Sequence, residues 1–179
     1  PYTRLFPCES ARTRQHDRQR QVRLLTANVL TSNHDSDKLL AIVEREQPDV
    51  LVTLESDDWW QQRLDVLEAD SEQYGYTHTL KCPLDNLYGM HVYSRLPLHD
   101  ASIDYLVEED VPSMHAQLEL ASGDRVRVHF LHPAPPSPTE NDESSERDAE
   151  LIIVARSVAD SQHPREHPHD DLRRQRVAR

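Results

Sequence analysis

Two apolar segments determine the fold class of this chain: VRLLTANVL at residues 22–30 and VLVTLE at residues 50–55. Both are short and rich in leucine and β-branched residues, which is typical of buried strands. Between them, Ser36 and Asp37 offer helix-capping side chains, and the helical pattern that follows ends before Pro48. Its apolar stripe consists of Leu39, Leu40, Ile42 and Val43. A strand, a helix and a second strand in this order form a crossover unit, so we predict strands that run in the same direction or lie in a closely related sheet.

The pattern downstream of this unit changes from helical to alternating. A second helix is predicted over residues 58–70, and a further helix over residues 147–159. Between them, short alternating segments are separated by turn residues, and their close spacing favours antiparallel pairing. These predicted strands cover residues 76–82, 88–94, 102–107, 113–120 and 125–131. The sequence therefore predicts an α/β (α+β) fold with an antiparallel-rich sheet at its centre and helices outside.

Composition excludes several classes of protein. A length of 179 residues suits one principal domain. The three glycines cannot build a glycine-rich phosphate cradle, and the two cysteines fit neither a disulfide scaffold nor a zinc cluster. No run reaches the roughly 18 apolar residues that a membrane span needs, so we expect a soluble chain with no span of its own.

Charge divides the chain into three parts. The net charge is -12, and because residues 1–21 carry +3 and residues 163–179 carry +2, the segment 22–162 carries -17. We interpret these parts as a basic linker, a folded domain and an irregular tail. An acidic domain repels phosphate backbones, so we do not expect general high-affinity binding of nucleic acid. An acidic enzyme that recruits a divalent cation to reach a phosphate ester is compatible with this charge.

Three polar residues lie at the carboxyl ends of predicted strands: Asn28, Glu55 and His132. Strand ends are where open α/β sheets place their sites. A carboxylate after Val-Thr-Leu is costly to bury alone, and a hard divalent cation bound by Glu55 and Asn28 would compensate for it. Alternatively, Glu55 caps the helix that begins near Asp58, and Asn28 ends its strand in a turn. His132 is either a fixed imidazole that donates to developing charge on phosphorus or an exposed loop histidine.

Read together, the segments resemble the endonuclease/exonuclease/phosphatase family of metal-dependent phosphoesterases, which includes exonuclease III and the deoxyribonuclease-I-like enzymes. The resemblance covers residues 22–162 and rests on the order of four features. These are the Thr-x-Asn-Val strand with Asn28, the strand ending in Leu54-Glu55, the segment Ser94-Arg95-Leu96-Pro97, and the strand ending in His132.

The resemblance implies a four-layer αββα sandwich and hydrolysis of phosphate esters with Mg²⁺ or Mn²⁺. It implies that Glu55 binds the metal, that Asn28 helps to hold the metal or the phosphate, and that His132 lies near the scissile phosphate. Asp85, Asn86 and Tyr88 would lie on the loop that rims the substrate cleft. The resemblance is greatest to a bacterial branch whose domain follows membrane helices. We therefore interpret the chain as a piece of a longer product whose relatives are membrane-anchored, with the domain outside the hydrocarbon core.

The carboxyl-terminal residues depart from the family's pattern. The family continues with a Gly-Asp-x-Asn motif and ends with a Ser-Asp-His segment, but residues 163–179 contain neither. Asp171 is a weak substitute for the missing acid, because Arg173 stands where an asparagine is expected. We therefore expect an incomplete sandwich with an exposed apolar face and impaired hydrolysis. The alternative is a non-catalytic acidic binding or accessory domain that retains the fold without the site.

Overall fold

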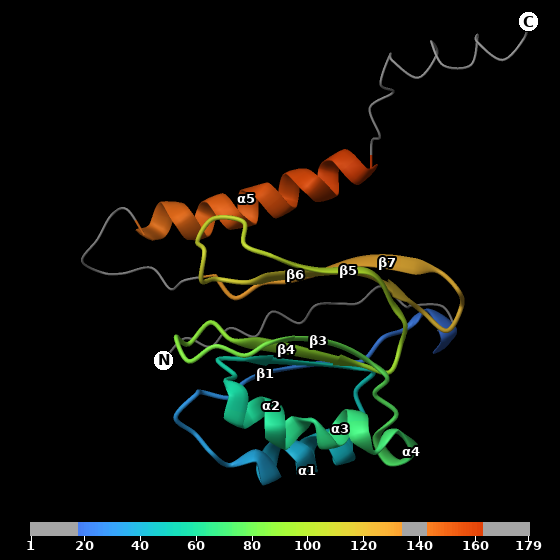
Figure 1. Ribbon diagram of the computed structural model, residues 1–179. Helices are drawn as coiled ribbons and strands as arrows, with labels where there is room; N and C mark the ends of the chain where they lie inside the picture. The colour runs from blue at the N-terminus through green and yellow to red at the C-terminus, as the bar shows by residue number, and fades with distance from the viewer. Residues whose placement is uncertain (1–17, 134–142, 163–179) are drawn as a thin grey trace, which may run out of the picture. The chain divides into compact units, whose positions relative to one another are not determined.

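The computed structural model describes residues 18–133 and 143–162 (Figure 1). The chain divides into two compact units, and each is described here by itself. The first unit combines Pro1–Asp104 with Pro112–His132, and the second combines Tyr105–Val111 with Pro133–Arg179. The described elements of the first unit are η1 (Arg18–Arg20), β1 (Leu24–Asn28), α1 (Ser36–Glu46), β2 (Val50–Leu54), α2 (Asp58–Leu64), α3 (Val66–Ala69), α4 (Ser71–Tyr74), β3 (His78–Cys82), β4 (Met90–Ser94), β5 (Leu98–Asp104), β6 (Ser113–Glu119) and β7 (Arg125–Phe130). The second unit contains α5 (Glu143–Gln162).

The strands of the first unit form two sheets. Four strands pair in the order β1-β2-β4-β3, and three pair in the order β5-β6-β7. The β1–β2 pair is parallel, as the crossover pattern predicts, and every other pair is antiparallel. In the parallel register Asn28 lies opposite Leu54, so both strands end at the same edge of the sheet.

Two apolar cores hold the first unit together. Figure 1 shows α1 to α4 on one face of the four-stranded sheet and the three-stranded sheet across its other face. The helix-side core includes Val43, Leu51, Trp60 and Tyr93, and the core between the sheets includes Val52, Val92, Met114 and Leu118. β2 and β4 contribute to both cores, so their side chains are almost all buried, as a central strand between two packed layers requires. The predicted α/β sandwich class is therefore confirmed.

Several element boundaries differ from the prediction. The single helix predicted over 58–70 is instead α2 followed by α3, and α4 comes directly after this range. Asp57 caps the start of α2 by accepting the Trp60 N–H at 3.0 Å, and Asp70 caps α4 by accepting the Gln73 N–H at 3.1 Å. The strand predicted over 102–107 is Leu98–Asp104 instead. A shift of register between His99 and Ser102 interrupts its alternation, which hid the first half of the strand from a period-based prediction.

The outer strands of the two sheets expose apolar side chains. Leu24 on β1 is 56% exposed and Val126 on β7 is 44% exposed. The predicted exposed apolar face, the completeness of the sandwich, and the linker, domain and tail boundaries stay predictions. Most of the linker and all of the tail, with Asp171, lie outside the described residues. Among the described residues, no helix combines the length and the apolar composition that crossing a bilayer requires.

Candidate functional site

The site is built where the parallel strands β1 and β2 end. Asn28 is the last residue of β1, and Glu55 follows directly after β2. The Asn28 amide Nδ2 donates to Glu55 Oε1 at 2.5 Å, while Asn28 Oδ1 accepts the Leu30 N–H at 3.1 Å. The structure therefore brings together the two residues that the sequence places at neighbouring strand ends. Asn28 does end its strand in a turn, and its amide also contacts the glutamate.

The backbone at Glu55 is held in a conformation that is unfavourable for a non-glycine residue. Its φ is 58°, in the left-handed region, and Leu30 on the adjoining loop also has a positive φ of 59°. The Thr31 hydroxyl donates to the Glu55 carbonyl at 2.9 Å, which ties the two loops together. Strain of this kind persists only where the surroundings enforce it, and it concentrates at functional sites. Glu55 is not a helix cap, because Asp57 caps α2.

His132 reaches the same place from the second sheet, two residues after β7. Its Nε2 lies 3.8 Å from Glu55 Oε1, and the side chains of His132 and Glu55 are only 20% and 18% exposed. The Tyr88 ring lies 5.9 Å from the His132 ring between centroids. His132 is thus a partly buried imidazole beside a carboxylate and not an exposed loop histidine.

The remaining predicted cleft residues are placed differently. Asn86 Oδ1 accepts the Tyr88 N–H at 3.0 Å, so this side chain shapes the turn that presents Tyr88. Asp85 lines a cavity of about 300 Å³ with Asp57, Asp58, Pro83 and Leu84, and this cavity has none of Asn28, Glu55 or His132 in its walls. Tyr88 is the rim residue whose ring lies beside that of His132.

One supporting feature was not found from sequence. The Ser56 N–H donates to the Gly89 carbonyl at 3.0 Å, and a Cβ at Gly89 would lie 2.0 Å from the Ser56 oxygen. Only glycine fits this approach between the residue after Glu55 and the start of β4. The sequence did contain a signal for this close approach. Gly89 is one of only three glycines in the chain, and it directly follows Tyr88, a predicted cleft residue.

The donor set suits a hard divalent cation. Carboxylate and amide oxygens are the ligands that Mg²⁺ prefers, and Mg²⁺ keeps several waters, so it needs few protein ligands. In the described part of the chain, the side-chain contacts of Glu55 involve Oε1, which leaves Oε2 for an ion. No group of three or more His, Cys, Asp or Glu side chains within residues 18–133 and 143–162 is arranged to hold a metal. The residues therefore fit a sparsely liganded magnesium or manganese ion and not a closed structural metal site.

A buried histidine lies behind the site on the helix face of the sheet. His91 on β4 is paired with Thr53 of β2, one position before the strand end, and is fully buried. Neither of its ring nitrogens has a hydrogen-bond partner among the described residues. Burial lowers the pKa of His91 to about 4, and the Lys81 ammonium nearby acts in the same direction. The imidazole is therefore neutral at pH 7.

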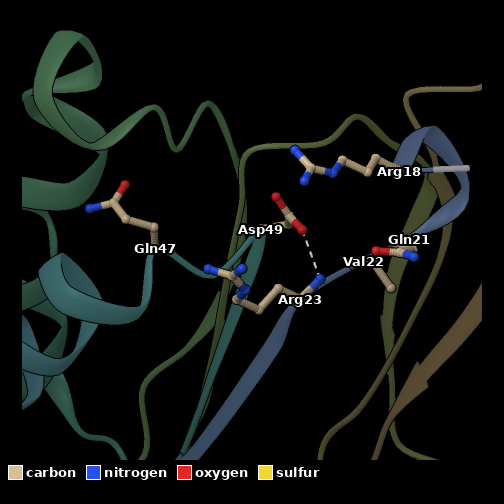
Figure 2. A pocket seen from close by; sticks show the side chains of 6 residues that line it. All are labelled: Arg18, Gln21, Val22, Arg23, Gln47 and Asp49. Atoms are coloured by element: carbon tan, nitrogen blue, oxygen red, sulfur yellow. Dashed lines mark hydrogen bonds between the residues drawn. The ribbon is translucent and has the colours of Figure 1, made fainter. Parts of the chain in front are cut away.

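The opposite end of the β1–β2 pair has a cavity of about 640 Å³ (Figure 2). It is lined by Arg18, Gln21, Val22, Arg23, Gln47 and Asp49. The Arg23 N–H donates to Asp49 Oδ2 at 2.7 Å, and the Arg23 carbonyl accepts the Asp49 N–H at 2.8 Å. The Arg23 guanidinium donates to the Glu46 carbonyl. These bonds fasten the start of β1 to the start of β2, so Asp49 has a structural role.

Comparison with known proteins places this geometry in a family. The model of the Endonuclease/Exonuclease/phosphatase family matches residues 25–165. Comparison with curated proteins finds no match. Among solved structures, a humanized TDP2 from D. rerio is 16% identical with a TM-score of 0.61, over 77% of this chain and 56% of that one. An endonuclease/exonuclease/phosphatase from Beutenbergia cavernae is 22% identical with a TM-score of 0.56, over 74% of this chain and 43% of that one.

Two further neighbours contain DNA. The 3' phosphatase NExo from Neisseria, bound to a product DNA hairpin, is 20% identical with a TM-score of 0.56, over 78% of this chain and 53% of that one. A D. rerio TDP2 structure is complexed with single-strand DNA product. These complexes of the neighbours run against the expectation that this fold does not support general high-affinity binding of nucleic acid. Net charge is a poor guide for this fold, because it averages over the whole surface and says little about one cleft.

The chain spans about half the length of the solved structures that it resembles. At these identities the structural likeness shows the fold alone. The family match is broader, since it covers most of the sequence, including the strand ends that carry Asn28, Glu55 and His132. This chain belongs to the endonuclease/exonuclease/phosphatase family, whose enzymes hydrolyse phosphate esters with a divalent metal ion.

Proposed function

We propose that this domain holds a divalent metal ion at Glu55 and Asn28 and hydrolyses phosphate esters there. The observation that supports the proposal is the convergence of Asn28, Glu55 and His132 from both sheets. A carboxylate, an amide and an imidazole at one edge supply a metal ligand, a group that orients it and a proton donor. The ion is Mg²⁺ or Mn²⁺, because the ligands are oxygens.

Each side chain has a distinct role in this proposal. When bound, the ion supplies a Lewis acid that stabilises negative charge on the phosphoryl oxygens. Asn28 holds Glu55 Oε1 and so keeps the carboxylate turned toward the ion. His132 Nε2 donates to a phosphoryl oxygen as its charge develops. Tyr88, beside His132, limits the space in which the ester can lie.

Hydrolysis by this chain alone should be slow. In the described part of the chain, Glu55 belongs to no group of three or more His, Cys, Asp or Glu side chains that could hold a metal, and the sequence after α5 contains no Gly-Asp-x-Asn or Ser-Asp-His motif. Losing a group that activates water or stabilises transition-state charge costs about 10²–10⁴-fold in rate. We therefore propose an impaired phosphoesterase, with a non-catalytic binding domain as the second candidate.

The assay is release of nitrophenol from bis-nitrophenyl phosphate with Mg²⁺ or Mn²⁺, repeated with a chelator. We expect weak turnover that needs the metal and falls at least about tenfold in Glu55→Gln, since removing a metal ligand or its orientation is costly. The matched control is Asp58→Asn, which removes an exposed acid nearby and should leave turnover unchanged. Turnover that is equal in Glu55→Gln would contradict the proposed site. Metal binding without any turnover would favour the non-catalytic domain.

A further inference from the structure

Two histidines face each other across neighbouring strands of the three-stranded sheet. His115 on β6 lies directly opposite His129 on β7 in the antiparallel register. Their Nδ1 atoms are 2.7 Å apart, and the ring centroids are separated by 4.8 Å with an interplanar angle of 68°. The two rings therefore meet through one nitrogen each and do not stack face to face.

This histidine pair projects from the side of the sheet that faces away from the inter-sheet core. Alternate residues of both strands pack in that core, namely Met114 and Leu118 of β6 and Val128 and Phe130 of β7. Because successive side chains of a strand point to opposite faces, His115 and His129 lie on the other face. The pair therefore lies on a surface of its own, away from the inter-sheet core.

A carboxylate beside the pair determines which ring nitrogens carry protons. Asp104 Oδ2 lies 3.9 Å from His115 Nε2, and the Ser102 hydroxyl donates to the same oxygen at 2.8 Å. A carboxylate on this side favours a proton on Nε2 of His115, which leaves its Nδ1 with a lone pair. The proton between the two Nδ1 atoms then belongs to His129, whose buried Nε2 has no hydrogen-bond partner among the described residues.

The pair is neutral enough and open enough to receive an ion. Burial holds the pKa of His129 below its ordinary value, and the neighbouring His115 and Arg127 act in the same direction. The His129 ring is therefore mainly neutral at pH 7, and neutral imidazole is the commonest metal ligand in proteins. The His115 side chain is 18% exposed and that of Asp104 is 50% exposed, so an ion can reach the pair from solvent.

The separation of the two nitrogens favours one coordination geometry. Two nitrogens that each lie about 2.0 Å from one ion are about 2.8 Å apart at a right angle and about 3.3 Å apart at the tetrahedral angle. The observed 2.7 Å matches the right angle, which is the angle between neighbouring positions of a square plane. Square-planar coordination is typical of Cu²⁺, which is also the most tightly bound of the first-row divalent ions.

We propose that His115 and His129 bind Cu²⁺ through their Nδ1 atoms, at a site that is independent of the ion proposed at Glu55. The ion replaces the shared proton, which moves from Nδ1 to Nε2 of His129, so both rings stay neutral and both Nδ1 lone pairs are donated. Water or small anions fill the remaining positions of the plane. Asp104 orients His115 through Nε2.

The two proposed sites differ in the metal that they select. The Glu55 site offers oxygen ligands, which suit Mg²⁺ or Mn²⁺, whereas imidazole nitrogens suit Cu²⁺. A site with two histidines is also consistent with the finding that, within residues 18–133 and 143–162, no group of three or more His, Cys, Asp or Glu is arranged to hold a metal.

Nuclear magnetic resonance of the unaltered chain locates the site. Cu²⁺ is added in substoichiometric amounts to the full chain labelled with ¹⁵N, and the broadening of each amide signal is followed. We expect the amides of β6 and β7 beside the pair to broaden first. Location is informative because the chain has eleven histidines, three of them within residues 163–179. Broadening that begins at any other histidine would overturn the proposal.

Variants measure the contribution of each imidazole by calorimetric titration with Cu²⁺. His115→Ala and His129→Ala should each weaken binding at least about tenfold, and the double variant should lose little more, because both rings hold the same ion. His99→Ala is the matched control: His99 lies on the same sheet, with Nε2 2.8 Å from Glu119 Oε2, and should not matter. Unchanged binding in either single variant, or equal loss in the control, would overturn the site. If a variant fails to fold, the location of broadening in the wild type decides.

Glu55→Gln separates this site from the proposed function. The variant should bind Cu²⁺ as tightly as the wild type, whether or not the chain hydrolyses bis-nitrophenyl phosphate. Loss of Cu²⁺ binding in Glu55→Gln would place the ion at the carboxyl ends of β1 and β2 and reject the histidine pair. Loss of hydrolysis alone would leave the histidine pair intact.

Discussion

The two ends of the β1–β2 pair each carry an acidic side chain, and the structure treats them differently. At the amino end, Asp49 accepts the Arg23 N–H at 2.7 Å, and its own N–H bonds to the Arg23 carbonyl. At the carboxyl end, Glu55 has a positive φ of 58°, and its side-chain contacts are the Asn28 amide and the His132 imidazole at 3.8 Å.

This difference separates a structural carboxylate from a functional one. Asp49 is bonded into the backbone that starts both strands, so removing it costs stability. Glu55 sits on strained backbone and is oriented by side chains, an arrangement that stabilises the fold poorly and leaves an oxygen for a ligand. Opposite ends of one strand pair thus each carry a carboxylate, one that stabilises the fold and one that is available to a ligand. Substitutions at either end, or in the sheet between them, test this difference.

The largest effect is expected at Gly89, which supports the carboxyl end. Gly89→Ala should lower the free energy of unfolding by about 3 kcal/mol or more, because its Cβ would overlap the Ser56 backbone and force the strand apart. Urea unfolding measures the change. Gly123→Ala is the control: nothing lies within 4 Å of its Cβ, so only its φ of 84° matters, at about 1 kcal/mol. A smaller loss at Gly89 than at Gly123 would mean that the two loops are not locked together.

The second effect concerns the buried His91 behind the same end. Its pKa of about 4 in the fold lies below its ordinary value of 6.5, so the unfolded chain binds more protons between these values. Stability therefore keeps its full value above about pH 6.5 and falls as the pH drops toward 4, by about 3 kcal/mol in all. His91→Phe should remove this part of the pH dependence.

Urea unfolding at about pH 7 and about pH 4.5 gives the two free energies to compare. His78→Phe serves as the control, because His78 is only partly buried. The same loss in His91→Phe as in the wild type would show that another group carries the pH dependence.

The smallest effect compares the two carboxylates directly. Asp49→Asn should lower the free energy of unfolding by about 1 kcal/mol, because a charge-assisted bond to the Arg23 N–H becomes an ordinary one. Glu55→Gln should change stability by less than about 0.5 kcal/mol, since the carboxylate has no fixed cation partner. Thermal and urea unfolding of both variants give the comparison. A larger loss for Glu55→Gln would make Glu55 a structural residue.

Periodicity was sufficient to predict the unit that positions the site. The apolar runs at 22–30 and 50–55 and the stripe before Pro48 predict β1, α1 and β2, and a parallel pair forces Asn28 and Glu55 to one edge. The position of His132 could be proposed because it follows an alternating strand. Its distance from Glu55 depends on how the two sheets pack against each other, and the residue pattern of a single strand gives no information about that packing.

Local exceptions to periodicity account for the features that sequence missed. The second predicted helix is interrupted at Asp65, and Asp70 ends it by capping α4. The irregular register between His99 and Ser102 hides half of β5. Asp85 is directed to another cavity because the turn after β3 is set by local bonds. The stack of His34 on Trp59 joins the loop after β1 to α2, and no pattern within either segment indicates it.

The central claim is that the carboxyl end of the β1–β2 pair holds a metal ion and the amino end does not. Its most direct test is a calorimetric titration of the chain with Mn²⁺. The account predicts one site in the wild type and in Asp49→Asn, and at least about tenfold weaker binding in Glu55→Gln. Binding that is unchanged in Glu55→Gln, or lost in Asp49→Asn, would contradict it and place the metal elsewhere.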